Sequence, residues 1–267
     1  MPTSLSLLTL NCFGTPVPTT RRRLLALSNQ IERSALQLIC LQEVQLVTYQ
    51  RLLMQACASF PFQAYEPYLH SPKGGLVTFS RLPLAAQHFE SYEEQGRWYL
   101  PTLMDRVLNK GMLITSLHWG EIPVVVINTH VVANYSGDWE RRGMFTRMQE
   151  KQLRQLAETV IAQPANAVVL VAGDFNIPRG SRLYTDFLHS TGLTDPLAED
   201  RRPTHRPPRG VPARYALPID FALVRVPATL SLQITCDLRF SSKFELSHKY
   251  EDYLSDHNAI EVSLTMN

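Results

Sequence analysis

Carboxylate, amide and imidazole side chains stand at the ends of short apolar runs throughout this chain. The first apolar run ends at Asn11, and the second ends with Gln42 and Glu43. The other members of this set are His130, Asp174, Asn176, Asp220, Asp256 and His257. Such groups are costly to bury unless they are paired or bind a metal. We therefore expect one rim of convergent polar groups above a sheet core.

This set of residue types favours phosphoryl chemistry assisted by a metal. Mg²⁺ is a hard cation that takes oxygen ligands, usually one or two carboxylates together with water and substrate phosphate. Glu43 is the natural first ligand, and Asn11 could hold a water or add its own carbonyl oxygen. Asp174 and Asn176 lie two residues apart on a segment that we expect to be extended. Both would then point to one side and orient an attacking water and a phosphate oxygen.

Two histidines complete the expected chemistry. His257 is the candidate general base, because an imidazole titrates near neutral pH. A carboxylate such as Asp220 would hold the imidazole in one tautomer and stabilise the imidazolium. His130 could donate a hydrogen bond to a phosphate oxygen or to the leaving group.

Each of these residues taken alone also has a plain structural explanation. Asn11 could end its strand in a turn, and Glu43 could lie at the start of a helix. Asp174 could form an Asx turn, and His257 could be a hydrogen-bonded core histidine. Their occurrence together and in this order favours the functional interpretation.

Six short motifs, taken in order, resemble those of the endonuclease/exonuclease/phosphatase superfamily, which includes deoxyribonuclease I and the neutral sphingomyelinases. They are LNCFG at residues 10–14, LQEV at 41–44, GGLVTFSRLP at 74–83, GDFN at 173–176, IDF at 219–221 and SDH at 255–257. A chance match of six motifs in the right order is very rare. The resemblance implies an α/β fold, a four-layer sandwich of two face-to-face mixed β-sheets flanked by helices.

The resemblance also implies a role for each position of the set. Mg²⁺ would be the cofactor, with Mn²⁺ able to replace it, and Glu43 would bind it beside Asn11. Asp174 would position or activate the nucleophilic water, and Asn176 and His130 would contact the phosphate. Asp220 would pair with His257. Asp256 would support the site or bind the metal.

Three features are closest to the neutral sphingomyelinase branch. They are NCFG followed by Pro16, NKG at residues 109–111 before a strand, and THVVANY at residues 129–135 before an arginine-bearing helix. In the last stretch Tyr135 is a candidate substrate contact, and Val132 replaces the second histidine of the branch's pattern. Arg214 is another candidate, because the arginines of residues 200–218 could attract phosphate or could simply form a solvated loop.

This chemistry needs elements that place the residues together. Apolar runs rich in Val, Ile and Leu predict strands at residues 5–12, 36–41, 75–80, 111–117, 123–128, 167–172, 219–226 and 259–264. Apolar residues three to four apart predict helices at residues 21–34, 141–163 and 181–191. Some strands alternate with helices and others follow one another directly, which favours two packed sheets flanked by helices. No linker-like tract divides residues 1–267, so we expect a single domain.

The composition is that of a globular protein, since 45% of the 267 residues are hydrophobic and 19% are charged. A formal net charge of +2 is too small to indicate nucleic-acid binding by bulk charge. The four cysteines form no CxxC pair, and we expect them to be reduced. No apolar run reaches the length of a membrane span, and residues 1–10 lack the features of a secretion signal. We therefore expect a cytoplasmic monomer without a stable membrane anchor.

Three functions remain open from the sequence. The first is a Mg²⁺-dependent phosphodiesterase acting on a phospholipid head group or a small phosphodiester. The second is a nuclease or a phosphomonoesterase, and the third is a non-catalytic binding module. A nuclease needs a basic groove, whereas a lipid enzyme needs exposed apolar loops beside its site. Trp98, Tyr99 and Leu100 could form such a lipid-facing patch or could be anchored in the core.

Overall fold

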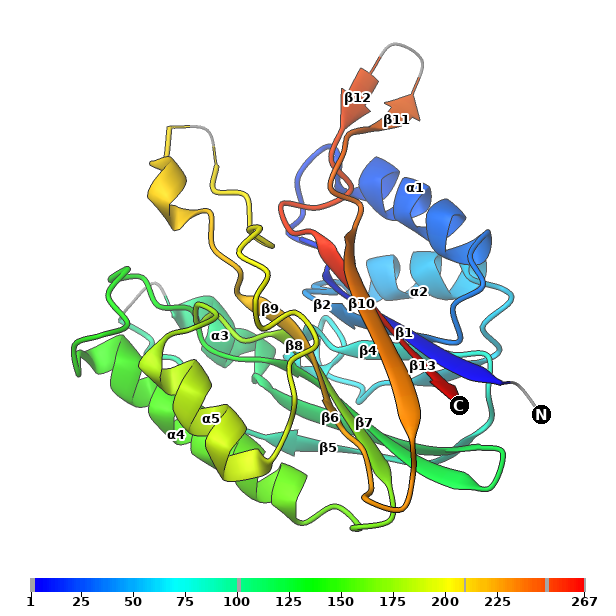
Figure 1. Cartoon of the computed structure of the whole chain (residues 1–267). Coiled ribbons are helices and arrows are strands. Elements are labelled where there is room, and N and C mark those ends of the chain that lie inside the picture. The colour runs from blue at the N-terminus through cyan, green and yellow to red at the C-terminus, as the bar shows by residue number, and fades with distance from the viewer. Residues whose placement is uncertain (1–2, 100–101, 209, 248–249, 267) are drawn as a thin grey trace.

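The computed structural model describes residues 3–99, 102–208, 210–247 and 250–266 and contains two large β-sheets (Figure 1). The strands of the six-stranded sheet are, in spatial order, β10 (Leu232–Arg239), β13 (Ala259–Met266), β1 (Ser4–Asn11), β2 (Leu38–Gln42), β4 (Val77–Ser80) and β3 (Phe62–Ala64). Those of the five-stranded sheet are β5 (Leu84–Ser91), β6 (Gly111–Trp119), β7 (Ile122–His130), β8 (Val168–Asp174) and β9 (Asp220–Arg225). A separate hairpin consists of β11 (Phe244–Ser247) and β12 (Tyr250–Asp252).

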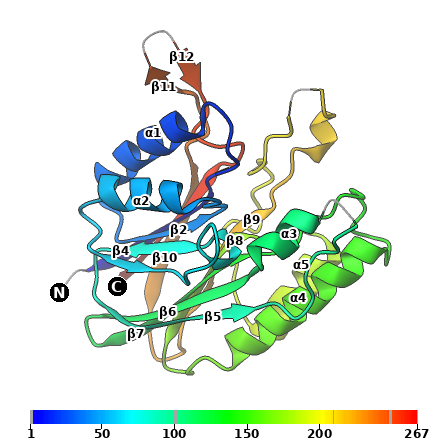
Figure 2. The ribbon, with the colours of Figure 1, turned by 180° about the vertical axis from the view of Figure 1, so that it is seen from behind.

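Helices cover the outer face of each sheet, which gives the molecule four layers (Figures 1 and 2). The six-stranded sheet is covered by α1 (Thr20–Glu32) and α2 (Val47–Ala56), and the five-stranded sheet by α4 (Met144–Ile161) and α5 (Arg182–Thr191). A shorter helix, α3 (Leu103–Leu108), follows β5. Both sheets contain parallel and antiparallel neighbours. The predicted four-layer sandwich of two mixed sheets is confirmed.

Alternate residues of the central strands face different layers. In β7, Val124 and Val126 lie in the core between the two sheets, whereas Val125 and Ile127 pack beneath α4 and α5. Both faces of such a strand are buried, so its sequence is a continuous apolar run and not an alternating pattern. For this reason each of the eight predicted strands coincides with a strand of the structure.

The strands that the apolar runs did not reveal are edge strands or very short. β5 and β10 each lie at the edge of a sheet, and most of their side chains are at least partly exposed. An edge strand that buries one face lacks a long apolar run. Residues 90–110, for which no strand or helix was predicted, include the end of β5 and all of α3. None of the helices in the described part of the chain combines the length and apolar character that crossing a bilayer requires.

Candidate active site

The sheet topology brings the predicted site residues to one edge of the sandwich. β1 and β2 run parallel and β13 is antiparallel to β1, so β13 begins where β1 and β2 end. In the other sheet β7 and β8 run parallel, and β9 is antiparallel to β8. In this register Asp174 lies between His130 and Asp220. The edge therefore collects residues from both sheets.

Asn11 joins the two sheets at this edge. Its amide nitrogen donates to Oε1 of Glu43 and to Oδ2 of Asp174, at 3.0 Å in each case. Its amide oxygen accepts from the backbone nitrogen of Phe13 at 3.0 Å. Asn11 thus lies beside Glu43 as expected, but its nitrogen and not its oxygen faces the carboxylates.

His257 and Asp220 form a buried pair across the two sheets. Nδ1 of His257 lies 2.8 Å from Oδ2 of Asp220, and each side chain is less than a tenth exposed. Burial alone would lower the pKa of His257, but the charges of Asp220 and Asp174 raise it well above its ordinary value. The aspartate holds the proton on Nδ1, and Nε2 lies 3.8 Å from Oδ2 of Asp174. The predicted pairing of these two residues is present.

His130 lies on the other side of Asp174. Its Nε2 is 3.5 Å from Oδ2 of Asp174, and its buried Nδ1 has no hydrogen-bond partner among the described residues. Burial, followed by the positive charges of Lys110 and His257, lowers the pKa of His130 well below its ordinary value. The imidazole is therefore neutral at physiological pH and can donate one hydrogen bond to a ligand.

Asp174 and Asn176 do not share an extended segment. Asn176 has a φ of 53°, and its backbone nitrogen donates to Oδ1 of Asp174 at 2.9 Å, which makes an Asx turn. Its side-chain nitrogen donates to the carbonyl oxygen of Val131 at 3.0 Å. The expectation that both side chains point to one side of a strand is wrong. The tight turn is what keeps Asn176 at the same edge as Asp174.

Two glycines permit this close arrangement. Gly173 has a φ of 149°, and a Cβ there would lie 1.9 Å from the carbonyl oxygen of Thr129. A Cβ on Gly14 would lie 2.0 Å from the carbonyl oxygen of Glu43. A larger residue at either position would displace the backbone that carries Glu43 or Asp174. The glycines of the LNCFG and GDFN motifs therefore have a steric explanation.

The clustered carboxylates fit a hard divalent cation. Burial raises the pKa of Glu43, and burial together with the charge of Asp220 raises the pKa of Asp174 to about 7. Oδ1 of Asp220 is buried and has no hydrogen-bond partner among the described residues. The raised pKa values show that burial disfavours the charged form of these carboxylates. Bound Mg²⁺ or Mn²⁺ would stabilise their charged form, because both ions take oxygen ligands. Asp256, which is half-buried, lies next to His257 in the chain and close to it in space.

A buried lysine behind the site was not predicted to act there. Nζ of Lys110 forms an ion pair with Oδ1 of Asp105 at 2.6 Å and donates to the carbonyl oxygen of Val131 at 3.0 Å. The same carbonyl oxygen accepts the hydrogen bond from Asn176. Lys110 therefore ties α3 to the segment that follows His130. The NKG motif contains this lysine, but the sequence alone did not show what it contacts.

Two buried amides below the site were also missed. Nε2 of Gln42 donates to Oδ1 of Asn128 at 2.7 Å, and Nδ2 of Asn128 donates to the carbonyl oxygens of Leu41 and Val77 at 3.2 and 3.1 Å. Both amides lie in the apolar layer between the sheets and are fully buried. Oε1 of Gln42 has no hydrogen-bond partner among the described residues, but the bonds that the pair does make fix how the two sheets fit together. They hold the two halves of the site at a set separation.

His205 is a further residue that the sequence did not reveal. It lies in the loop between α5 and β9, and its ring centroid is 4.9 Å from that of His257. The contact forms because residues 204–206 pair with residues 256–258. That pairing joins segments about fifty positions apart, and no local pattern indicates it.

The two predicted substrate contacts lie in loops that touch each other. Tyr135 is exposed, and partial burial together with nearby negative charges, including Glu43, raises its pKa to about 12. Arg214 is exposed and lies over the ring of Tyr215 at 5.1 Å. A Cβ on Gly137 would lie 2.7 Å from that same ring. Neither Tyr135 nor Arg214 bonds to the buried carboxylates in the described part of the chain, so their roles stay predictions.

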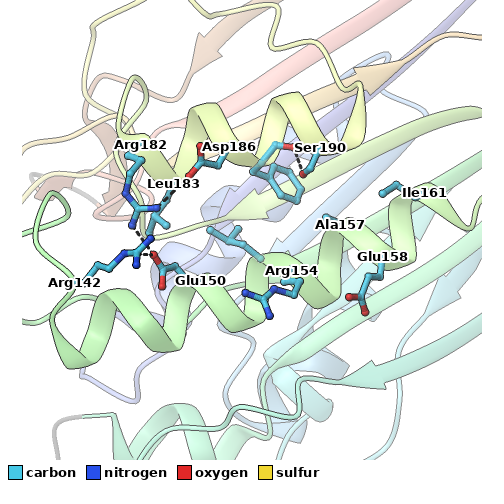
Figure 3. A pocket seen from close by; sticks show the side chains of 12 residues that line it. Arg142, Glu150, Arg154, Ala157, Glu158, Ile161, Arg182, Leu183, Asp186 and Ser190 are labelled. Carbon is cyan, nitrogen blue, oxygen red and sulfur yellow. Dashed lines mark hydrogen bonds and ion pairs between the residues drawn. The ribbon is translucent and has the colours of Figure 1, made fainter.

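A groove of about 520 Å³ lies between α4 and α5, on the outer face of the molecule (Figure 3). In this groove Arg182 lies 2.5 Å from Glu150 and 3.1 Å from Asp186. None of the predicted site residues lines it. The candidate active site is therefore the strand edge and not this groove.

The sandwich fold and the cluster of carboxylate, amide and imidazole groups define a class of hydrolases that act on phosphoester bonds. Residues 8–257 match the Endonuclease/Exonuclease/phosphatase family, and the chain belongs to that family. The resemblance noted in the sequence is thereby confirmed over nearly the whole chain.

Curated relatives and solved structures agree with this assignment. The chain is 27% identical over 168 residues to the inositol phosphosphingolipids phospholipase C of Saccharomyces cerevisiae and 28% identical over 125 residues to the sphingomyelinase C of Leptospira interrogans. These matches cover 61% and 46% of this chain but only 34% and 21% of the relatives. Among solved structures, SmcL has a TM-score of 0.76 with 16% identity, covering 99% of this chain and 100% of SmcL. TDP2 from C. elegans has a TM-score of 0.75 with 14% identity, covering 98% and 75%.

Proposed function

We propose that this chain is a phosphodiesterase that depends on a divalent cation, Mg²⁺ in the first place, and that it hydrolyses the head group of a phospholipid. One observation carries the proposal: the His257–Asp220 pair lies beside the buried carboxylate of Asp174, which the amide of Asn11 links to the half-buried carboxylate of Glu43. A base and a cation site at one edge of the sandwich suit the attack of water on a phosphodiester. The relatives named as phospholipase C and sphingomyelinase C support a lipid substrate.

Glu43 would hold the cation, with Asn11 orienting its carboxylate and Asp256 beside it. A bound divalent cation supplies charge stabilisation to the phosphoryl oxygens. Asn11 contributes by donating to the carboxylates of both Glu43 and Asp174, which fixes the two at one separation.

His257 would take the proton from the attacking water. Asp220 holds the proton on Nδ1, so once the ring has lost its Nε2 proton this nitrogen offers its lone pair on the side where Asp174 lies. The carboxylate of Asp174 would position the water for the attack. Asp220 also stabilises the imidazolium that forms after proton transfer.

His130 and Asn176 would bind the phosphate. His130 is held neutral by burial, so it can donate to a phosphoryl oxygen or to the leaving group. Asn176 is held in place by its bond to the Val131 carbonyl oxygen. Tyr135 and Arg214, in the two touching loops, would contact the head group.

Exposed aromatic residues favour a lipid substrate over nucleic acid. Trp98 and Tyr99 are 73% and 74% exposed, so these two are not anchored in the core. Leu100, the third member of the expected patch, lies outside the described residues. Exposed tryptophan and tyrosine side chains partition into the head-group region of a bilayer. We place the lipid surface at this loop.

A substrate screen tests the proposal. The enzyme would be assayed in Mg²⁺ on sphingomyelin, lysophospholipid, plasmid DNA, abasic DNA, inositol phosphates and bis-p-nitrophenyl phosphate. We expect hydrolysis of a phospholipid head group in vesicles. Trp98→Ala should lower the rate on vesicles several-fold and leave bis-p-nitrophenyl phosphate hydrolysis unchanged, while the exposed control Ile161→Ala changes neither. Turnover confined to DNA or to phosphomonoesters would contradict the lipid assignment.

A further inference from the structure

A second cluster of metal-binding atoms lies on the solvent side of the proposed base. Residues 204–206 run antiparallel to residues 256–258, with bonds from Arg206 N to Asp256 O at 2.7 Å and from Asn258 N to Thr204 O at 2.6 Å. These two bonds flank the opposed residues 205 and 257, which therefore form a pair without hydrogen bonds between them. In such a pair the side chains lie on the same face and approach closely.

The remaining donor atoms of this pair are free to bind an ion. Nδ1 of His257 is committed to Asp220, and Nδ1 of His205 lies 3.4 Å from the carbonyl oxygen of Tyr215. In its neutral form each ring keeps a lone pair on Nε2, so zinc must displace the Nε2 proton wherever the ring is protonated. Asp256 adds a carboxylate oxygen, and one donor atom from each of His205, Asp256 and His257 lies within 4.8 Å of the other two.

The backbone around this cluster is held rigidly. The guanidinium of Arg206 donates to the carbonyl oxygens of Ser255 and His257, at 2.8 and 3.2 Å, and to the side-chain oxygen of Asn258. His205 and Asp256 are half-buried, so one side of the cluster is open to solvent. An ion could reach these three side chains without opening the core.

We propose that His205, Asp256 and His257 form a binding site for Zn²⁺, distinct from the all-oxygen site at Glu43, and that Zn²⁺ bound there inhibits the enzyme. Two imidazoles with one carboxylate are the ligand set of open tetrahedral zinc sites, in which water takes the fourth position. Mg²⁺ is a hard cation that selects oxygen donors, so the two sites discriminate between the two ions. Zinc at Nε2 of His257 occupies the lone pair that would accept the proton of the attacking water. Binding at this site stands on the geometry alone, whereas inhibition rests on the proposed function.

Equilibrium dialysis against Zn²⁺ in saturating Mg²⁺, with bound zinc measured by atomic absorption, tests the site without any assay of activity. We expect one equivalent of zinc on the wild-type protein. His205→Phe keeps an aromatic ring but removes both nitrogens, and it should weaken zinc binding at least tenfold. Asp256→Asn should weaken it as well. The control His88→Phe alters an exposed histidine on β5 and should bind zinc as the wild type does.

A fourth variant separates the two metal sites. Glu43→Gln should keep its zinc, because Glu43 is not a ligand of the second site. Zinc binding that survives His205→Phe and Asp256→Asn, or that is lost in Glu43→Gln, would overturn the proposal. The Zn²⁺ concentration that halves Mg²⁺-supported hydrolysis should rise in His205→Phe by the same factor as the Zn²⁺ dissociation constant measured by dialysis. If zinc binds as expected but the protein hydrolyses no phosphoester, the zinc site stands and the proposed function fails.

Discussion

Nδ1 of His257 lies 2.8 Å from Oδ2 of Asp220, and the two residues belong to different sheets. His257 precedes β13 of the six-stranded sheet, and Asp220 begins β9 of the five-stranded sheet. The amide of Asn11 makes a second such link, to Asp174. The site therefore exists only when the two sheets are packed together, and its geometry depends on the packing of the whole sandwich.

The His257–Asp220 pair should behave as one catalytic unit. His257→Ala should lower kcat/KM by about 10²–10⁴-fold, because it removes the positioned base. Asp220→Asn should cost nearly as much, since the imidazole loses its tautomer control and its charge partner. Combining both changes should cost far less than the product of the single losses.

A double-mutant cycle on kcat/KM measures this coupling, with circular dichroism to verify folding. His88→Ala is the matched control, because His88 is exposed on β5 and has no predicted role. Fully multiplicative losses would show that His257 and Asp220 act independently and would refute the dyad.

Binding of Mg²⁺ should release protons near neutral pH. Burial and the charge of Asp220 raise the pKa of Asp174 to about 7, and burial raises the pKa of Glu43. A carboxyl group loses its proton when it faces a cation, so Mg²⁺ and protons compete for this cluster. The affinity for Mg²⁺ should therefore rise with pH between about 6 and 8.

Calorimetry at pH 7 in two buffers of different ionisation enthalpy counts the protons released. We expect the observed enthalpy of Mg²⁺ binding to differ between the two buffers. The difference equals the number of protons released multiplied by the difference between the ionisation enthalpies of the buffers. Identical enthalpies in both buffers would mean that no buried carboxyl group is protonated in the metal-free protein, contrary to this account.

Removing the charge of Lys110 should destabilise the fold strongly. Lys110→Met leaves the carboxylate of Asp105 buried without its partner, and breaking a buried ion pair costs about 3–5 kcal/mol. The matched control is Lys151→Met, whose partner Glu94 lies at 2.7 Å but whose own side chain is 62% exposed. Exposed pairs contribute about 0–1 kcal/mol. Urea unfolding compares the two variants, and equal losses of unfolding free energy would contradict the structural role assigned to Lys110.

The sequence predicted which residues would meet at one edge of the sandwich, because these residues mark strand ends. Glu43, His130 and Asp174 each end or follow a strand that is buried on both faces, and such strands appear as continuous apolar runs. The order of the motifs then identified the fold, and the parallel and antiparallel pairings placed the strand ends at one edge.

Contacts between segments that are far apart in the chain could not be predicted from the sequence. His205 lies beside His257 only because residues 204–206 pair with residues 256–258. Lys110 donates a hydrogen bond to the carbonyl oxygen of Val131 beside the site. The two residues are far apart in the sequence, so no local pattern predicts this contact. Asn176 was misplaced for a different reason, since its left-handed φ of 53° replaces the extended backbone that the strand pattern favours.

The central claim is that this edge of the sandwich hydrolyses phosphodiesters with a divalent cation held by Glu43. The most direct measurement is the rate of bis-p-nitrophenyl phosphate hydrolysis in Mg²⁺ and in EDTA, for the wild type, Glu43→Gln and the exposed control Glu121→Gln. We expect EDTA to abolish turnover and Glu43→Gln to lower it at least about 100-fold, because the metal's charge stabilisation is worth several kcal/mol. Glu121→Gln should match the wild type. Equal rates in EDTA and Mg²⁺, or full activity of Glu43→Gln, would contradict the account.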